Sequence, residues 1–363
     1  MLKTLHHPNG TTRQIHLGGW KKQFTDARDE EFRVKLHGSF LKIAPSADNR
    51  PICSPVEDQG DLGSCTANMF AGLVESNEIK RIGPNYTNVK LDDATGGGAK
   101  VTVSNVAVAA NGVITYTTKV VPPAPPAPTP PAPPAPPQPT PPSPPQPTPP
   151  TPPAPPAPPP TPPTPPAPAK LERASRLFEY YATRKIEGTV NEDSGATIRD
   201  AIKAGAQYGV ADEAAWGYDI SKFTTNPPTT VWSSAATHMV TSYHAITDGD
   251  LQTMKSVLAS GFLIGFGFQV FDYMMSAQMA STGMLPYPGQ DEQLQGGHAV
   301  CLVGYDDTKQ ITRSDGTVST GAFLVRNSWG TGWGLAGYFW VAYDYVGDTN
   351  LASDFWVVQS API

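Results

Sequence analysis

A 47-residue proline tract divides this chain and limits what can fold around it. Of the 41 prolines in the 363 residues, 31 lie between Pro122 and Pro168, in a stretch made only of Pro, Ala, Thr, Ser and Gln. Such a stretch has no aliphatic or aromatic bulk to bury, so it cannot form a core. It is typical of polyproline II or a disordered linker. Any globular unit must therefore be assembled from sequence on both sides of the tract.

The segments around the tract have different compositions. Residues 1–50 are polar, are predicted to be irregular and form an N-terminal extension, whereas residues 51–86 and 170–363 carry globular patterning. Between them, residues 87–121 hold two alternating runs separated by Asn111-Gly112, which predicts an inserted β-hairpin. Without residues 87–169, about 280 residues remain, enough for one substantial domain.

Charge and composition exclude several classes of protein. The net charge of −6 is mild and no basic block predicts nucleic-acid binding. No run of eighteen apolar residues predicts a membrane span, and the first residues lack the apolar core of a signal peptide. The three cysteines are too few for a disulfide framework, and the histidines show no metal-ligand spacing with them. We therefore expect a reducing compartment, no metal and no cofactor.

Two distant stretches contain residue types that thiol acyl-transfer chemistry requires. Residues 59–65 read Gln-Gly-Asp-Leu-Gly-Ser-Cys, His298 lies in Gly-Gly-His-Ala-Val, and Asn327 opens Asn-Ser-Trp-Gly-Thr-Gly-Trp-Gly. The apolar positions after Cys65 predict an amphipathic helix from Cys65 to Ile82. The partial positive charge of that helix N-terminus would favour a thiolate at Cys65.

Each of these residues has a predicted role in the chemistry. An imidazole such as His298 can take the thiol proton of Cys65, and Asn327 can orient the imidazole. Gln59 can donate to a developing oxyanion together with the Cys65 backbone N–H. Trp329 can shield the His–Asn hydrogen bond from water. A lone buried cysteine is more often a small hydrophobic residue, and a lone histidine in a strand a core residue, but their order and spacing favour catalysis.

The remaining pattern predicts helices first and strands second, an α+β arrangement in two lobes. We expect further helices near residues 195–208 and 250–260. The expected strands cover residues 262–271, 298–305, 321–326, 337–343 and 354–359.

On these motifs the chain resembles the papain-like cysteine proteases over residues 51–86 and 170–363. Residues 55–60 are similar to the family's Pro-Val-x-x-Gln-Gly lead-in, and residues 327–334, closing at Gly337-Tyr338, match its asparagine motif. The resemblance implies a helical lobe carrying the cysteine and an antiparallel, barrel-like β lobe carrying the histidine and asparagine. It implies that Ser194 and Gly195 hold the substrate residue two before the cut in an antiparallel contact, and that Gly297 and Trp329 also line the substrate site.

The chain departs from the secreted members of that family. Leu62 stands where those members carry a disulfide cysteine, and residues 63–67 read Gly-Ser-Cys-Thr-Ala, as in the bacterial, archaeal and viral branch. This favours a cytoplasmic or virion-associated protein. The long propeptide is missing, so residues 1–50 are either a short propeptide-like blocking segment or structural support.

The sequence thus predicts a peptidase that cleaves peptide or protein substrates through a thioester acyl-enzyme. Two alternatives are a virion or surface attachment protein that uses the fold as a scaffold, and a thiol acyltransferase. The proline-rich arm either presents the hairpin to an unknown partner or is a tolerated loop expansion, because the cost of closing a loop grows slowly with its length.

Overall fold

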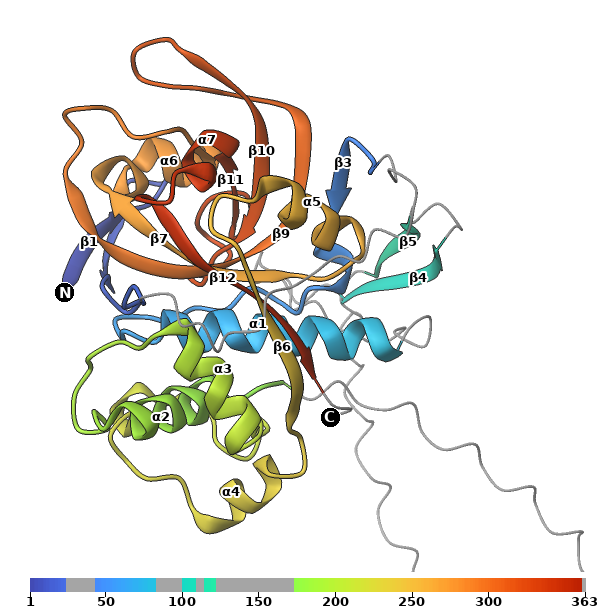
Figure 1. Cartoon of the computed structure of the whole chain (residues 1–363), viewed down its shortest axis with the longest axis vertical. Helices are drawn as coiled ribbons and strands as arrows, with labels where there is room; N and C mark the ends of the chain where they lie inside the picture. The colour runs from blue at the N-terminus through green and yellow to red at the C-terminus, as the bar shows by residue number, and fades with distance from the viewer. Residues whose placement is uncertain (24–42, 83–99, 109–113, 122–172, 361–363) are drawn as a thin grey trace, which may run out of the picture.

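The computed structural model describes residues 1–23, 43–82, 100–108, 114–121 and 173–360. Figure 1 shows a β-rich part above a long central helix and a helical part below it. The helices of this part of the chain are α1 (Cys65–Ile82), α2 (Arg176–Glu187), α3 (Ile198–Gln207), α4 (Thr229–Ala235), α5 (Leu251–Ala259), α6 (Ala277–Thr282) and α7 (Tyr343–Gly347). The strands are β1 (Leu2–His6), β2 (Thr12–His16), β3 (Ser46–Asp48), β4 (Lys100–Val108), β5 (Ile114–Val121), β6 (Val240–Ile246), β7 (Ile264–Phe271), β8 (Met284–Leu285), β9 (Leu294–Thr312), β10 (Val318–Arg326), β11 (Tyr338–Ala342) and β12 (Ala352–Ser360).

Helix α1 runs between the two parts and begins at Cys65, so the predicted helix from Cys65 to Ile82 is confirmed. Its character differs from the prediction, because the helix is buried on nearly every side rather than amphipathic. Even Glu75 and Glu78 are buried. The sheet covers one side of α1 and the helical lobe covers the other, so polar positions on the helix face protein instead of water.

The helical lobe is formed mainly by α2, α3 and α4, whose ends carry local signals. The hydroxyl of Ser175 accepts from the backbone N–H of Phe178 at the start of α2, and Gly188 ends that helix in the left-handed region. The hydroxyl of Thr197 caps α3 in the same way, so the helix expected from residue 195 begins at Ile198. These caps fix the loop between α2 and α3, which borders the start of α1.

The β lobe is one eight-stranded sheet in the order β6-β12-β7-β9-β10-β11-β8, with β3 added alongside β9. All five predicted strands are present. The largest difference is β9, which extends over nineteen residues instead of the eight expected. The sheet is mixed rather than wholly antiparallel, because β8 pairs in parallel with β11. The α+β two-lobed architecture predicted from the sequence is confirmed.

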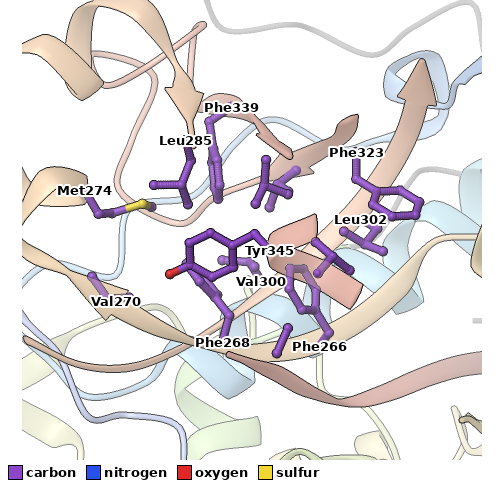
Figure 2. Packing of buried hydrophobic residues seen from close by; sticks show 14 of the residues in the cluster. Phe266, Phe268, Val270, Met274, Leu285, Val300, Leu302, Phe323, Phe339 and Tyr345 are labelled. Carbon is purple, nitrogen blue, oxygen red and sulfur yellow. The ribbon is translucent and has the colours of Figure 1, made fainter. Parts of the chain in front are cut away.

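The core of the β lobe is aromatic and lies on one face of this sheet. Figure 2 shows side chains from β7, β9, β10, β11 and α7 meeting there, with Phe268, Phe323, Phe339 and Tyr345 among them. Full burial of such a side chain stabilises the folded state by about 1.5–3 kcal/mol. Strand β9 is central to this packing, so the segment that carries His298 is held from both edges.

The sequence predicted that the N-terminal residues are irregular, but the first of them form a hairpin. Strands β1 and β2 form an antiparallel hairpin that pairs Leu2 with His16 and His6 with Thr12. Its inward positions Leu5 and Ile15 are buried in the core of the β lobe. Alternation over five residues is a weak signal, and only tertiary burial makes the hairpin stable.

The insertion is described in part. Strands β4 and β5 pair antiparallel, as expected for the predicted hairpin, while Asn111-Gly112 and the proline tract lie outside the described residues. Among the described helices, none combines the length and apolar character needed to cross a membrane.

Candidate active site

Cys65 is the first residue of α1 and is fully buried. The loop before it is held by Asp193, whose carboxylate accepts from the backbone N–H of Gly63 at 3.0 and 3.1 Å. The same carboxylate accepts from the Tyr180 hydroxyl on α2. A charged side chain from the helical lobe therefore fixes the turn that presents the sulfur.

His298 on β9 and Asn327 at the end of β10 form the second half of the site. His298 Nε2 lies 2.8 Å from Asn327 Oδ1, and that oxygen also accepts from the backbone N–H of Ser328 at 2.8 Å. The Ser328 N–H identifies this atom as the amide oxygen, which can only accept hydrogen bonds. The imidazole must therefore donate to it through Nε2. A neutral His298 then carries an unprotonated Nδ1, which has no hydrogen-bond partner among the described residues.

The indole of Trp329 covers this pair. Its ring stacks on the imidazole, with centroids 4.9 Å apart and an angle of 24° between the planes. Trp329 and His298 are both buried, and Trp333 packs against Trp329 edge-on. The indole therefore lies against the His298 ring, and the shielding and substrate-binding roles of Trp329 stay predictions.

The backbone N–H of Ala299, the residue after His298, lies within hydrogen-bonding reach of the Cys65 thiol. Burial raises the pKa of this thiol to about 12, although that N–H and those of Thr66 and Cys65 oppose the shift. Burial likewise lowers the pKa of His298 to about 4, opposed by the hydrogen bond to Asn327. The structure therefore holds an uncharged thiol and an uncharged imidazole. The helix N-terminus was predicted to favour a thiolate at Cys65, but the exclusion of water from the covered site disfavours the thiolate more strongly.

Gln59 is fully buried beside the same site. Its Oε1 accepts from the Ser328 hydroxyl at 2.7 Å, which orients the amide. Its Nε2 donates to Leu62 O at 3.0 Å and to His16 O at 3.5 Å. One N–H of Gln59 thus points at a carbonyl oxygen from the N-terminal part of the chain.

Residues 17–23, here called the crossing segment, continue from β2 past Gly297 and Cys65. The N–H of Gly18 donates to Gly297 O at 2.9 Å, beside His298. The carbonyl of Gly19 accepts from Ala196 N–H at 2.8 Å, and Lys21 N–H donates to Ala196 O at 3.0 Å. A Cβ on Gly19 would lie 2.8 Å from Cys65 Sγ and 2.5 Å from Gly63 O. The crossing segment therefore covers the sulfur at contact distance.

The predicted substrate residues lie around the crossing segment, with one shift in position. Gly195 has a φ of 68° and its N–H donates to the Tyr180 hydroxyl, while the Ser194 hydroxyl contacts Lys21 Nζ at 3.3 Å. The backbone that pairs with the crossing segment belongs to Ala196. The substrate contact of Ser194 and Gly195 stays a prediction, and no sequence signal marks Ala196.

Within the described part of the chain, the cysteines and acidic residues form no cluster that could hold a metal ion. All three cysteines are buried and free, and no group of three or more metal-ligating side chains occurs within the described ranges. Cys301 lies on β9 and donates to Met69 O at 3.3 Å, as expected for a core thiol.

A helical lobe with a cysteine at the start of its central helix, set against a sheet with a histidine–asparagine pair, defines the class of papain-like cysteine proteases. Residues 188–358 match the family described as papain family cysteine protease. The resemblance to this family found in the sequence is confirmed over these residues.

Individual relatives agree with this assignment. The chain is 43% identical over 192 residues to an uncharacterized peptidase C1-like protein of Acanthamoeba polyphaga mimivirus, covering 51% of this chain and 58% of the relative. It is 30% identical over 106 residues to cysteine proteinase 3 of Entamoeba histolytica, covering 29% of this chain and 30% of that protein. The chain therefore spans less than two thirds of either curated relative.

Among solved structures, xylellain, a cysteine protease from Xylella fastidiosa, matches with a TM-score of 0.64 and 25% identity over 99% of both chains. Procathepsin L2 from the larval midgut of Tenebrio molitor matches with a TM-score of 0.54 and 18% identity, covering 95% of this chain and 78% of its own. The second likeness shows the fold alone.

Proposed function

We propose that this chain is a cysteine peptidase that hydrolyses peptide bonds through Cys65, His298 and Asn327. The observation that carries the proposal is the Nε2–Oδ1 hydrogen bond of 2.8 Å between His298 and Asn327, with Nδ1 left as a proton acceptor. We infer that the Cys65 thiol, which interacts with the Ala299 N–H, is the group that loses a proton to it.

The reaction follows from these positions. The thiol proton moves to His298 Nδ1 while Sγ bonds to the peptide carbonyl carbon. His298 returns that proton to the leaving nitrogen as the C–N bond breaks, which leaves a thioester on Cys65. Water then gives a proton to His298, attacks the thioester carbon and releases the carboxylic acid and the thiol. Gln59 Nε2 and the Cys65 backbone N–H are placed to stabilise the oxyanion of both steps.

The crossing segment must leave before a substrate can bind. It contacts the sulfur through Gly19, and the carbonyl oxygen of His16, the residue before it, accepts from the Gln59 amide. It pairs with Ala196 in parallel, whereas the family resemblance implies an antiparallel substrate strand. A segment of reversed direction does not present a carbonyl to Cys65 as a substrate does. We therefore propose that the N-terminal extension is propeptide-like and inhibitory, with residues 51–86 and 170–363 as the peptidase domain.

The first test uses the full chain with Gly19→Ala, which opens the site, and compares it with Gly19→Ala/Cys65→Ala. We expect hydrolysis of a mixed peptide library by the first protein and none by the second. Gly19→Ala/Cys53→Ala is the matched control, since it removes another buried thiol and should keep the activity. Cleavage at an unchanged rate without the Cys65 sulfur would refute the proposal.

The two alternatives are tested by the same protein. An attachment scaffold would leave Cys65 unlabelled by a peptidyl epoxide in the folded, reduced Gly19→Ala chain. An acyltransferase would give amide products when amines are added, instead of free acids. No feature of the described residues favours either one over hydrolysis.

A further inference from the structure

One peptide group in the turn before Cys65 is held on both sides. The carbonyl oxygen of Leu62 accepts from Gln59 Nε2 at 3.0 Å. The N–H of the same peptide group, that of Gly63, donates to the two carboxylate oxygens of Asp193 at 3.0 and 3.1 Å. Because the C=O and N–H of a peptide group lie in one plane, the contact with Asp193 on one side fixes the contact with Gln59 on the other.

The direction of the Gln59 amide follows from this contact. Its Oε1 accepts from the Ser328 hydroxyl at 2.7 Å, and one N–H of Nε2 donates to Leu62 O. The other N–H faces His16 O at 3.5 Å and loses that acceptor when the N-terminal extension leaves. A primary amide has two N–H groups in a fixed plane, so binding one of them aims the other. The freed N–H of Gln59 is therefore aimed by the peptide group that Asp193 holds.

Asp193 is itself held by two side chains of α2. Tyr180 is fully buried, and its hydroxyl donates to Asp193 Oδ1 at 2.5 Å. One turn further along the helix, the guanidinium of Arg184 lies over the Tyr180 ring, 3.9 Å from its centroid. It donates to the carbonyl oxygens of Val190 and Glu192 at 2.9 and 2.8 Å. The loop that leads to Asp193 is thus fastened to α2 by buried groups.

The same tyrosine also reaches the backbone on the substrate side. Its hydroxyl accepts from the N–H of Gly195 at 3.1 Å. Gly195 precedes Ala196, the residue whose backbone pairs with the crossing segment. Hydrogen bonds through Asp193 and Tyr180 therefore join the turn that presents the sulfur to the backbone at Gly195. None of these partners belongs to the crossing segment, so the connection stays when that segment leaves.

The charge of Asp193 does not explain its place beside Cys65. Burial is the main cause that raises the pKa of the Cys65 thiol, and the negative charge of Asp193 acts in the same direction. A negative charge also opposes a developing oxyanion. The contribution of this carboxylate therefore lies in the hydrogen bonds that it accepts. A carboxylate accepts several strong hydrogen bonds at once, as the Gly63 N–H and the Tyr180 hydroxyl require.

We propose that Asp193 and Tyr180 are positioning residues for peptide hydrolysis. They hold the peptide group between residues 62 and 63 and thereby aim the two oxyanion donors, Gln59 Nε2 and the Cys65 N–H. The inference rests on the proposed peptidase function and deepens it. Because both side chains act on the transition state through other groups, their loss lowers kcat and changes KM little.

The test uses the full chain with Gly19→Ala, which opens the site, and measures kcat and KM separately. A segment that competes with the substrate changes the apparent KM and not kcat, because saturating substrate displaces it. Adding Asp193→Ala should lower kcat by roughly ten- to hundredfold, the scale of a misplaced oxyanion donor. Asp193→Asn keeps an acceptor oxygen for the Gly63 N–H and should recover most of that loss. The matched control is Asp315→Ala, which removes a carboxylate that accepts from Thr317 N–H at 2.8 Å in the turn between β9 and β10.

Tyr180→Phe tests the same connection from the other side and serves where Asp193→Ala does not fold. It removes the hydroxyl and keeps the ring that packs on Arg184, and kcat should fall by about tenfold. Since the two side chains act through one hydrogen bond, Asp193→Ala/Tyr180→Phe should lose no more than Asp193→Ala alone. The control is Tyr287→Phe, which removes a similar hydrogen bond of 2.8 Å to Asp348 in the β lobe.

Three results would count against these roles. Equal losses of kcat from Asp193→Ala and Asp193→Asn would show that the charge matters and the hydrogen bonds do not. A chain that cleaves peptides with kcat unchanged by Asp193→Ala or Tyr180→Phe would overturn the inference and leave the peptidase function standing. No cleavage by the Gly19→Ala chain, together with no electrophile labelling of Cys65, would refute the peptidase function, and the inference would fall with it.

Discussion

The packing along α1 and the segment over Cys65 are built in different ways. Two turns along the helix from Cys65, α1 packs on Arg326, whose Nη2 donates to Pro55 O at 2.7 Å and to Ser54 Oγ at 3.2 Å. A Cβ on Gly72 would lie 2.6 Å from Arg326 Nη1, so the helix rests directly on the guanidinium. Over Cys65, the crossing segment is held by backbone hydrogen bonds, by Trp20, and by contacts of the Lys21, Lys22 and Gln23 side chains.

The two regions therefore depend on different free energies. The packing along α1 depends on unfolding of the whole domain, whereas the crossing segment depends on its own local opening. The groups under α1 come from several elements and bury charge, so they are lost only when the domain unfolds. The crossing segment is a single stretch of chain outside the helices and the large sheet, so it can lift while the rest stays folded. Under the proposed function, access of substrate to Cys65 then depends on the crossing segment.

The largest effect is expected under α1. Arg326→Ala removes the cation that opposes the burial-raised pKa of Glu75, itself fully enclosed. Loss of one partner of a buried charge pair costs about 3–5 kcal/mol, so urea should unfold the variant at a much lower concentration. Lys222→Ala, which removes an exposed pair with Asp219, should leave the urea concentration of unfolding nearly unchanged, because solvent screens that pair. Similar losses from both variants would contradict the proposed contrast.

A smaller, local effect is expected above the site. Gly19→Ala places a Cβ against Gly63 O and Cys65 Sγ, and such overpacking costs about 1–3 kcal/mol. The crossing segment should leave more often, and alkylation of Cys65 by iodoacetamide should accelerate by roughly ten- to hundredfold. Gly217→Ala, where an added Cβ would meet only Glu213 O at 3.7 Å, should leave the rate unchanged. If the two variants react equally, the crossing segment does not guard the sulfur.

The third expected effect is a change in pH dependence. Burial disfavours the thiolate, and the pKa of Cys65 is raised to about 12 while the site is covered. Displacement of the crossing segment readmits water, which lowers that pKa because the charged form is solvated again. The alkylation rate of Gly19→Ala should therefore reach half of its maximum at least about one pH unit lower than in the wild-type chain. A higher or unchanged midpoint would show that the segment does not exclude water.

Much of this architecture is readable from the sequence. The helix at Cys65–Ile82, the strands carrying His298 and Asn327, and the two-lobed fold were predictable because periodicity and motif spacing are local signals. The pairing of His298 with Asn327 is likewise what the asparagine motif predicts.

Other features depend on contacts that no local pattern records. The hairpin of β1 and β2 is stable only because Leu5 and Ile15 reach a core made by distant residues. Asp354 and Trp20 are separated by most of the chain, and neither stands in a motif. The helix at Cys65 was expected to favour a thiolate, but the pKa depends on which segment covers it. Long-range packing decided each of these outcomes.

The position of the insertion has a consequence for how this enzyme can diversify. The chain departs after Ile82, at the end of α1 that lies roughly 27 Å from the sulfur, given a rise of about 1.5 Å for each helical residue. It is described again from Arg173, which pairs with Glu57, and Ala174 N–H donates to Glu75 at 2.9 Å. Because the departure lies at the end of α1 opposite the sulfur and the return is fastened by Glu57 and Glu75, evolution can lengthen, shorten or exchange the inserted region without moving Cys65.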